Sequence, residues 1–219
     1  EATEDATLTI EAGSIKGYYY GIMGNGNGGN RNGTVITMTG GKIEEGYCSD
    51  DNTGIFHPQL GTLTISGGEI TGYKSAIEMR SGTLNISNGT LVSTGSPADA
   101  EANGNGNTIT GAAIAVSQHT TNQELKAEIS GGTFTGVYAL YEEDKQDENV
   151  SNISMSVTGG TFDGKIFSEN CKNFIKGGTF SNPSACNYLG EGANVTVLLA
   201  DDYEGPGFAT ADGQTVVLN

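Results

Sequence analysis

The sequence is poor in several residue types, and their scarcity excludes some classes of protein. Lys and Arg total 10 against 26 Asp and Glu, which leaves a formal net charge of −16 at pH 7. Such a surface repels phosphate groups, so nucleic acids are excluded as partners, and anionic membranes and acidic polysaccharides are disfavoured. No apolar run approaches the roughly 20 residues that cross a bilayer, and residues 195–200 come nearest, so we expect no membrane insertion.

Tryptophan is absent, and there are only four prolines and three cysteines. Three cysteines cannot all pair with one another. Cys171 and Cys186 are separated by a short stretch of chain and could form a disulfide, but free, partly buried thiols are favoured over that bridge. Cysteine usage therefore leaves the cellular compartment open.

Glycine, by contrast, is abundant, with 35 residues, and it marks a repeat whose clearest copy is residues 61–81, GTLTISGGEITGYKSAIEMRS. The second residue of each Gly-Gly-like pair defines seven copies: Gly13, Gly41, Gly68, Gly89, Gly132, Gly160 and Gly178. An apolar residue stands three positions before each glycine: Ile10, Met38, Ile65, Ile86, Ile129, Val157 and Ile175. Another stands two positions after each: Ile15, Ile43, Ile70, Leu91, Phe134, Phe162 and Phe180. This period, with a short strand on each side of a glycine turn, is typical of repeat architectures.

Each copy predicts three short strands. In TLTIS, Leu63 and Ile65 alternate with Thr64 and Ser66, which is the period of a strand with one buried face. Gly68 can adopt a positive φ and turn a corner, after which residues 69–71 and 75–79 predict a second and a third strand. We therefore predict an all-β fold, a single-stranded right-handed parallel β-helix (solenoid) of about seven rungs with an irregular C-terminal cap.

Because the repeat covers most of the chain, residues 1–219 are predicted to form one domain. The rungs occupy about residues 7–182, and residues 96–107 interrupt the fourth rung as an insertion. Beyond residue 182 the repeat is lost, and residues 183–219 are predicted to cap the open end of the stack, with further strands at 195–199 and 215–218.

Tyrosines recur just after the second predicted strand. Because Tyr18, Tyr47 and Tyr73 belong to consecutive copies, their rings are predicted to line up along one edge. A tyrosine ring offers an apolar face and a hydroxyl, which suits a sugar. The alternative is a stack of rings that closes a corner of the core, and the exposure of the rings decides between the two. The predicted ligand-binding residues are Tyr18, Tyr47, Tyr73, Asp50, Asp51 and Glu78.

Metal binding and catalysis have weaker support. Asp50 and Asp51 are weak candidates for calcium ligands, because acidic turns of this kind more often cap the chain, and we expect no other cofactor. Asp50 or Asp51 with Glu78 is the only pair of carboxylates that we can place together for glycoside hydrolysis, with His57 nearby. Neither His57 nor His119 has the spacing of a metal-ligand set or of a catalytic triad.

The motifs TISGGEITG, EISGGTFTG and VTGGTFDG resemble those of right-handed parallel β-helix domains of the pectin-lyase-like type, especially in large secreted surface proteins of gut bacteria. The resemblance covers about residues 7–181. It implies a bacterial module at the cell surface or outside the cell, whose partner is a glycan or a host or bacterial surface protein. The chain has the acidic pair Asp50 and Asp51 but lacks the His-Gly and Arg-x-Lys motifs of polygalacturonase-like members, so the carry-over of catalytic residues fails at every position but that pair.

We therefore expect a non-catalytic module that is adhesin-like, glycan-binding or a spacer. The alternative is a glycoside hydrolase or polysaccharide lyase that acts on a neutral or weakly charged glycan. The scarcity of basic residues favours the first interpretation.

Overall fold

The computed structural model describes residues 5–26, 33–103, 106–118, 121–144 and 152–198, and their regular structure is dominated by β-strands. The strands are β1 (Thr7–Ile10), β2 (Ser14–Ile15), β3 (Tyr20–Met23), β4 (Val35–Met38), β5 (Lys42–Ile43), β6 (Thr53–His57), β7 (Thr62–Gly72), β8 (Ser75–Met79), β9 (Gly82–Ser93), β10 (Ala98–Asn103), β11 (Gly106–Thr110), β12 (Ala112–Val116), β13 (Leu125–Ile129), β14 (Thr133–Glu142), β15 (Ile153–Val157), β16 (Thr161–Ser168), β17 (Ile175–Phe180) and β18 (Leu189–Val197). A 3-10 helix, η2 (Pro183–Tyr188), precedes β18. The fold is all-β.

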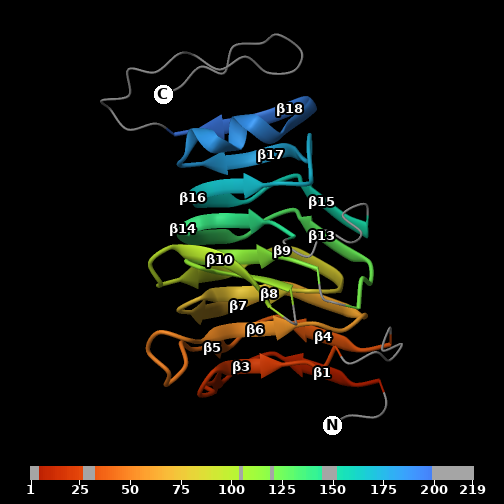
Figure 1. The fold of residues 1–219 in the computed structure, drawn as a ribbon, viewed down its shortest axis with the longest axis vertical. Helices are drawn as coiled ribbons and strands as arrows, with labels where there is room; N and C mark the ends of the chain where they lie inside the picture. The colour runs from red at the N-terminus through yellow and green to blue at the C-terminus, as the bar shows by residue number, and fades with distance from the viewer. Residues whose placement is uncertain (1–4, 27–32, 104–105, 119–120, 145–151, 199–219) are drawn as a thin grey trace.

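Successive copies of the repeat pair as parallel strands in register. Ile10 of β1 lies opposite Met38 of β4, and the same register continues to Ile65 of β7 and Ile86 of β9. A second series of parallel pairs joins β3, β6, β8, β12, β14 and β16. Figure 1 shows these strands stacked from β1 near the N-terminus to β18 at the other end of the long axis.

The two series are joined into a closed ring, which the sequence did not predict. β9 continues through the corner at Gly89 as one strand, so its first part pairs with β13 and its last part with β14. β17 likewise passes through Gly178 and pairs with both β15 and β16. The order β9-β13-β15-β17-β16-β14 therefore returns to β9 and closes a six-stranded parallel barrel, with the other strands outside the ring.

The prediction of an open β-helical solenoid of about seven rungs is therefore wrong, and the pectin-lyase-like assignment is wrong with it. That prediction assumed that each glycine corner ends one short strand and begins another. Instead, Gly89 (φ +118°) and Gly178 (φ +120°) bend the backbone while the strand continues. Strands that were expected on separate faces consequently belong to one hydrogen-bonded ring.

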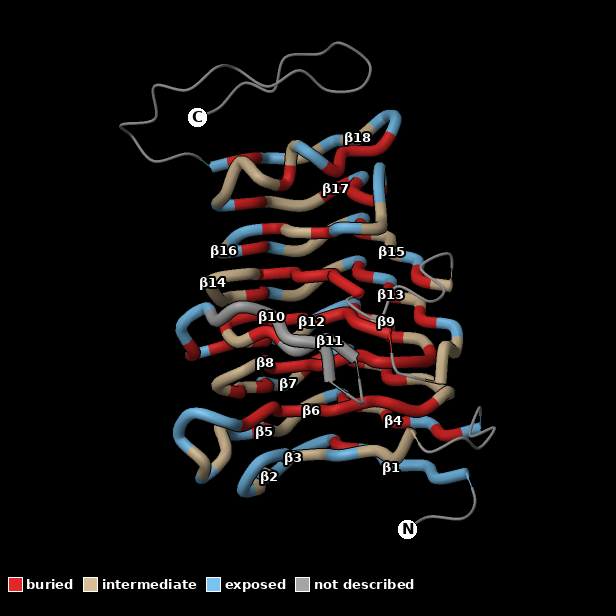
Figure 2. The backbone as a smooth tube through the Cα atoms, viewed as in Figure 1, coloured by how far each residue is buried: buried red, intermediate tan, exposed pale blue. Residues whose placement is uncertain are grey.

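The core lies inside the stack (Figure 2), and it includes the residues that the repeat predicted to face inward. All seven apolar residues that stand three positions before the repeat glycines are buried. Of the second set, only Ile15, at the N-terminal end, is partly buried rather than buried. Phe134, Phe162 and Phe180 stack on one another, with ring centroids 4.7 and 4.8 Å apart. The pattern of inward residues is confirmed.

The C-terminal part of the described chain is more regular than predicted. Asn182 caps η2, because its side-chain oxygen accepts a hydrogen bond from the Ser184 N–H at 3.0 Å. β18 then pairs in parallel with β17, for example Val197 opposite Phe180, and so adds a further strand to the sheet. The predicted strand at 215–218, and the rest of the predicted cap beyond residue 198, lie outside the described residues.

The insertion in the fourth copy forms an antiparallel hairpin, β10–β11, which is a separate two-stranded sheet. Ile109 of this hairpin packs with Ala112, Ala115 and Tyr141 in a small apolar cluster on the main sheet. The three cysteines are free, as favoured from the sequence. Within the described residues, no helix is long and apolar enough to cross a membrane.

Candidate functional site

Three irregular segments meet beside the first strands of the second series. They are residues 16–19 before β3, residues 44–52 before β6, and residues 73–74 before β8. Asn52 joins the second and third of these segments, because its buried side-chain oxygen accepts hydrogen bonds from the backbone N–H of Gly46 (3.1 Å) and of Tyr73 (2.9 Å). Its carbonyl oxygen accepts a third hydrogen bond, from the N–H of Lys74 (2.8 Å). Asn52 therefore positions the site from beneath the surface.

Two of the three predicted tyrosine rings are well exposed. Tyr18 is 59% exposed and Tyr47 is 68% exposed, whereas Tyr73 is partly buried. Their segments lie side by side, because the Cys48 N–H donates to the Tyr18 carbonyl oxygen at 3.1 Å. The Lys16 ammonium lies 4.8 Å from the centroid of the Tyr47 ring. Tyr18 and Tyr47 are thus surface groups and not a ladder within the core.

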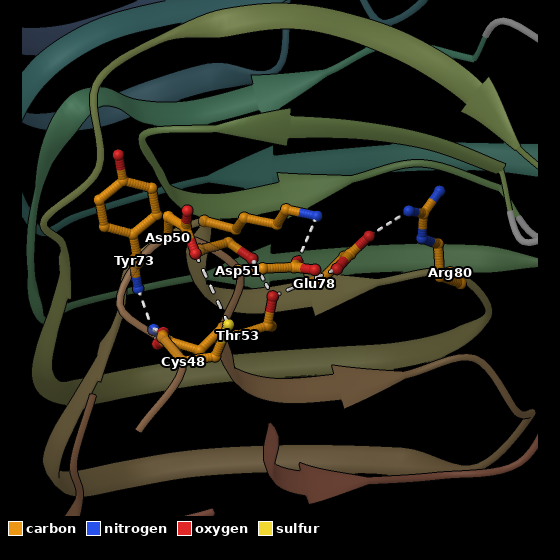
Figure 3. Close-up of polar contacts among 10 residues, drawn as sticks. Cys48, Asp50, Asp51, Thr53, Tyr73, Glu78 and Arg80 are labelled. Carbon is orange, nitrogen blue, oxygen red and sulfur yellow. Dashed lines mark hydrogen bonds and ion pairs between the residues drawn. The ribbon is translucent and has the colours of Figure 1, made fainter. Parts of the chain in front are cut away.

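The three predicted carboxylates have different surroundings (Figure 3). Asp50 is exposed and accepts a hydrogen bond from the Cys48 thiol at 3.6 Å. Asp51 forms an ion pair of 2.6 Å with the Lys74 ammonium. Glu78 is only 5% exposed and is paired with Arg80. Figure 3 shows Asp50 directed toward Cys48 and Glu78 directed toward Arg80, so these two acids point to different partners.

The described residues contain no group of three or more His, Cys, Asp or Glu side chains that could hold a metal ion. Asp50 and Asp51 are each engaged with a neighbouring side chain, a thiol in one case and an ammonium in the other. The geometry of this turn consequently adds no support for calcium binding. The absence of other cofactors stays a prediction.

A row of hydroxyl groups lies next to these acids, and it was missed from the sequence. Tyr20 of β3, Thr53 of β6 and Ser75 of β8 occupy the same register on adjacent strands. The Thr53 hydroxyl is 3.4 Å from the Ser75 hydroxyl and donates to Glu78 at 3.5 Å. The sequence carries a signal for this row, because each of its residues stands two positions before an isoleucine of the same buried register: Ile22, Ile55 and Ile77.

The pKa of Tyr20 is raised. Burial raises the pKa of Tyr20, the carboxylates of Glu78 and Asp51 raise it further, and the cations of Lys74 and Arg80 oppose them. The Tyr20 ring also packs on Phe56, with centroids 5.4 Å apart. Tyr20 is therefore influenced by two ion pairs, Asp51–Lys74 and Glu78–Arg80, and it contacts one aromatic side chain.

His57, which was expected near the candidate acids, is completely buried. Its Nδ1 lies 3.2 Å from the Ser81 carbonyl oxygen, and burial lowers its pKa from 6.5 to about 4. An imidazole without solvent contact cannot reach a substrate on the surface. His57 is a structural residue at this position, while His119 lies outside the described residues.

Comparison of the chain with models of protein families, with curated proteins and with solved structures finds no match. The pectin-lyase-like resemblance inferred from short motifs therefore receives no support from the comparisons.

Proposed function

We propose that this protein is a non-catalytic glycan-binding module of a secreted or cell-surface protein. The observation that carries the proposal is the pair of exposed rings, Tyr18 and Tyr47, on adjacent hydrogen-bonded segments. Exposed aromatic rings beside hydroxyl and charged groups offer an apolar face and polar partners together, which is the combination that a sugar ring uses. Leaving two large rings in water has no evident benefit for stability.

The surroundings of the acids favour binding over hydrolysis. A glycosidase needs two carboxyl groups that are free to act as acid and as base or nucleophile. Glu78 is buried against Arg80, and Asp51 is held by Lys74, so both acids are already neutralised by a partner. The buried His57 offers no alternative base. These contacts support a site that holds a ligand without transforming it.

The charge of the protein restricts the glycan. A net charge of −16 repels uronic acids and sialic acids over distances comparable to the Debye length, about 8 Å at physiological salt. We therefore expect a neutral or weakly charged oligosaccharide as ligand. Binding to it would depend little on ionic strength, because no net ion pairing takes part.

The proposal is tested by applying the protein and a Tyr18→Ala/Tyr47→Ala variant to an array of neutral and acidic oligosaccharides. We expect the wild type to bind neutral glycans and the variant to lose at least about tenfold in affinity, because a ring contact of this kind contributes about 1 kcal/mol. The melting temperature should change little, because both rings are exposed.

Leu198→Ala supplies the control, since Leu198 is also an exposed apolar residue but lies at the opposite end of the molecule, next to β18. This variant should bind as the wild type does. Wild-type protein that binds no oligosaccharide, or that cleaves one, would refute a non-catalytic glycan-binding function.

A further inference from the structure

We propose that Asp51, Lys74 and Tyr20 form a subsite that binds two neighbouring hydroxyl groups of a neutral sugar. This inference rests on the glycan-binding function proposed above and identifies the part of the site that selects the ligand. Tyr18 and Tyr47 would then supply general affinity for sugar rings. The subsite would discriminate between different sugars.

The ion pair has the geometry that a vicinal diol requires. The Lys74 ammonium and an Asp51 carboxylate oxygen are 2.6 Å apart, and both side chains are accessible, at 29% and 54% exposure. An ammonium group only donates hydrogen bonds and a carboxylate only accepts them. One sugar hydroxyl can therefore accept from Lys74 while its neighbour donates to Asp51, so that the pair binds both hydroxyls at once.

Tyr20 provides the third element. Tyr20 is 38% exposed and lies opposite Thr53, two residues after Asp51, while Thr53 in turn lies opposite Ser75, the residue after Lys74. Packing on Phe56 and the register with Thr53 hold the ring on the outer face of β3. A sugar whose hydroxyls contact the ion pair can thus lay an apolar C–H face on the ring of Tyr20.

The charges at the subsite cancel. Asp51 and Glu78 carry two negative charges, and Lys74 and Arg80 carry two positive charges. Within these two pairs each charge has a counter-charge, so the pairs themselves add no net attraction for an anion or a cation. An uncharged ligand with many hydroxyl groups can hydrogen-bond to both Lys74 and Asp51 while the two side chains stay close to each other.

A structural role does not account for the exposed pair. Ion pairs in contact with water contribute little to stability, so we expect the Asp51–Lys74 pair to contribute little to folding. The chain offers a matched pair elsewhere, Lys42–Glu69, with an N–O distance of 2.7 Å and exposures of 56% and 55%. This second pair bridges β5 and β7.

The test compares Lys74→Met with Lys42→Met in the full chain. The probes are the neutral oligosaccharide that binds best on the array and its analogues that lack a single hydroxyl. We expect Lys74→Met to weaken binding of the complete sugar at least tenfold and Lys42→Met to leave it unchanged, while both variants melt within a few degrees of the wild type.

The analogues give a readout that a merely structural residue would not affect. For the wild type, removal of one hydroxyl of the recognised diol should weaken binding about tenfold. For Lys74→Met the same removal should have almost no further effect, because the partner of that hydroxyl is already gone. Equal sensitivity of both proteins to every analogue would overturn the subsite.

The two proposals can fail separately. If Tyr18→Ala/Tyr47→Ala loses binding but Lys74→Met binds normally, the subsite is refuted and the glycan-binding function stands. If Lys74→Met loses binding but the tyrosine variant does not, the subsite stands and the role of the two exposed rings is refuted. If the wild type binds no oligosaccharide at all, both are refuted.

Discussion

The periodic core and the irregular segments beside it follow different rules. In the core, residues such as Ile65, Ile86 and Ile129 occupy one register on adjacent strands and meet neighbours of the same kind. In the site, Asn52, Asp51 and Lys74 come from segments of unequal length, and each has its own partners. The repeated core residues therefore stabilise the fold, while the irregular segments supply the polar and charged side chains of the candidate site. Substitutions should accordingly have large effects on folding in the core and small ones at the exposed part of the site.

The largest effect is expected from Ile129→Asp. Ile129 is 2% exposed and packs in the main core, so an unpaired carboxylate would be buried there or the strand would have to unfold. We expect a loss of at least about 5 kcal/mol in the free energy of unfolding, measured by denaturant titration. Ser154→Asp is the control, because Ser154 is an exposed residue of β15. A well-folded Ile129→Asp protein would show that the inward register does not carry the stability.

The second prediction compares the contributions of the two ion pairs of the site to stability. Glu78→Gln removes the acid partner of the buried Arg80 and should cost about 3 to 5 kcal/mol. Asp51→Asn, in the exposed pair, should cost less than about 1 kcal/mol. Thermal or denaturant unfolding of the two variants gives the comparison. Equal losses would mean that the surface pair is part of the folded framework and not a dispensable binding element.

A smaller loss of stability is expected when the pH is lowered. The folded pKa of His57 is about 4 and its ordinary value is 6.5, so the unfolded chain takes up the proton first as the pH falls. The stability due to neutral His57 is complete above pH 6.5 and is lost between pH 6.5 and 4, by about 3 kcal/mol in total. His57→Gln should lack this dependence on pH. A wild type and a His57→Gln variant with parallel stability curves from pH 7 to 4 would contradict this account.

Much of the core was predictable from the residues alone. The positions on either side of each glycine are buried because an apolar side chain at a constant offset from a corner has to face the same way in every copy. The seven glycines themselves all have positive φ, as their place at the corners requires. These features depend on local geometry, so a single copy of the repeat is enough to infer them.

The candidate site was predicted only in part. The sequence left open whether the tyrosines are exposed or buried in the core; Tyr18 and Tyr47 are exposed, and Tyr73 is partly buried. Glu78 was expected to be a surface acid, yet it is buried, and nothing local distinguishes it from an exposed strand residue. Burial at Glu78 depends on groups that are far away in the sequence.

By itself, the sequence determined that this chain is all-β, which apolar residues face inward, and where the backbone turns. The tertiary structure alone decided that β9 and β17 run through their corners and close a ring of six strands. The reason is that a glycine with positive φ can either end a strand or bend a strand that continues. Only pairing with the neighbouring strands selects between these two outcomes. The same holds for the ion pair of Asp51 and Lys74, whose partners, 23 positions apart in the sequence, meet only because their strands are adjacent.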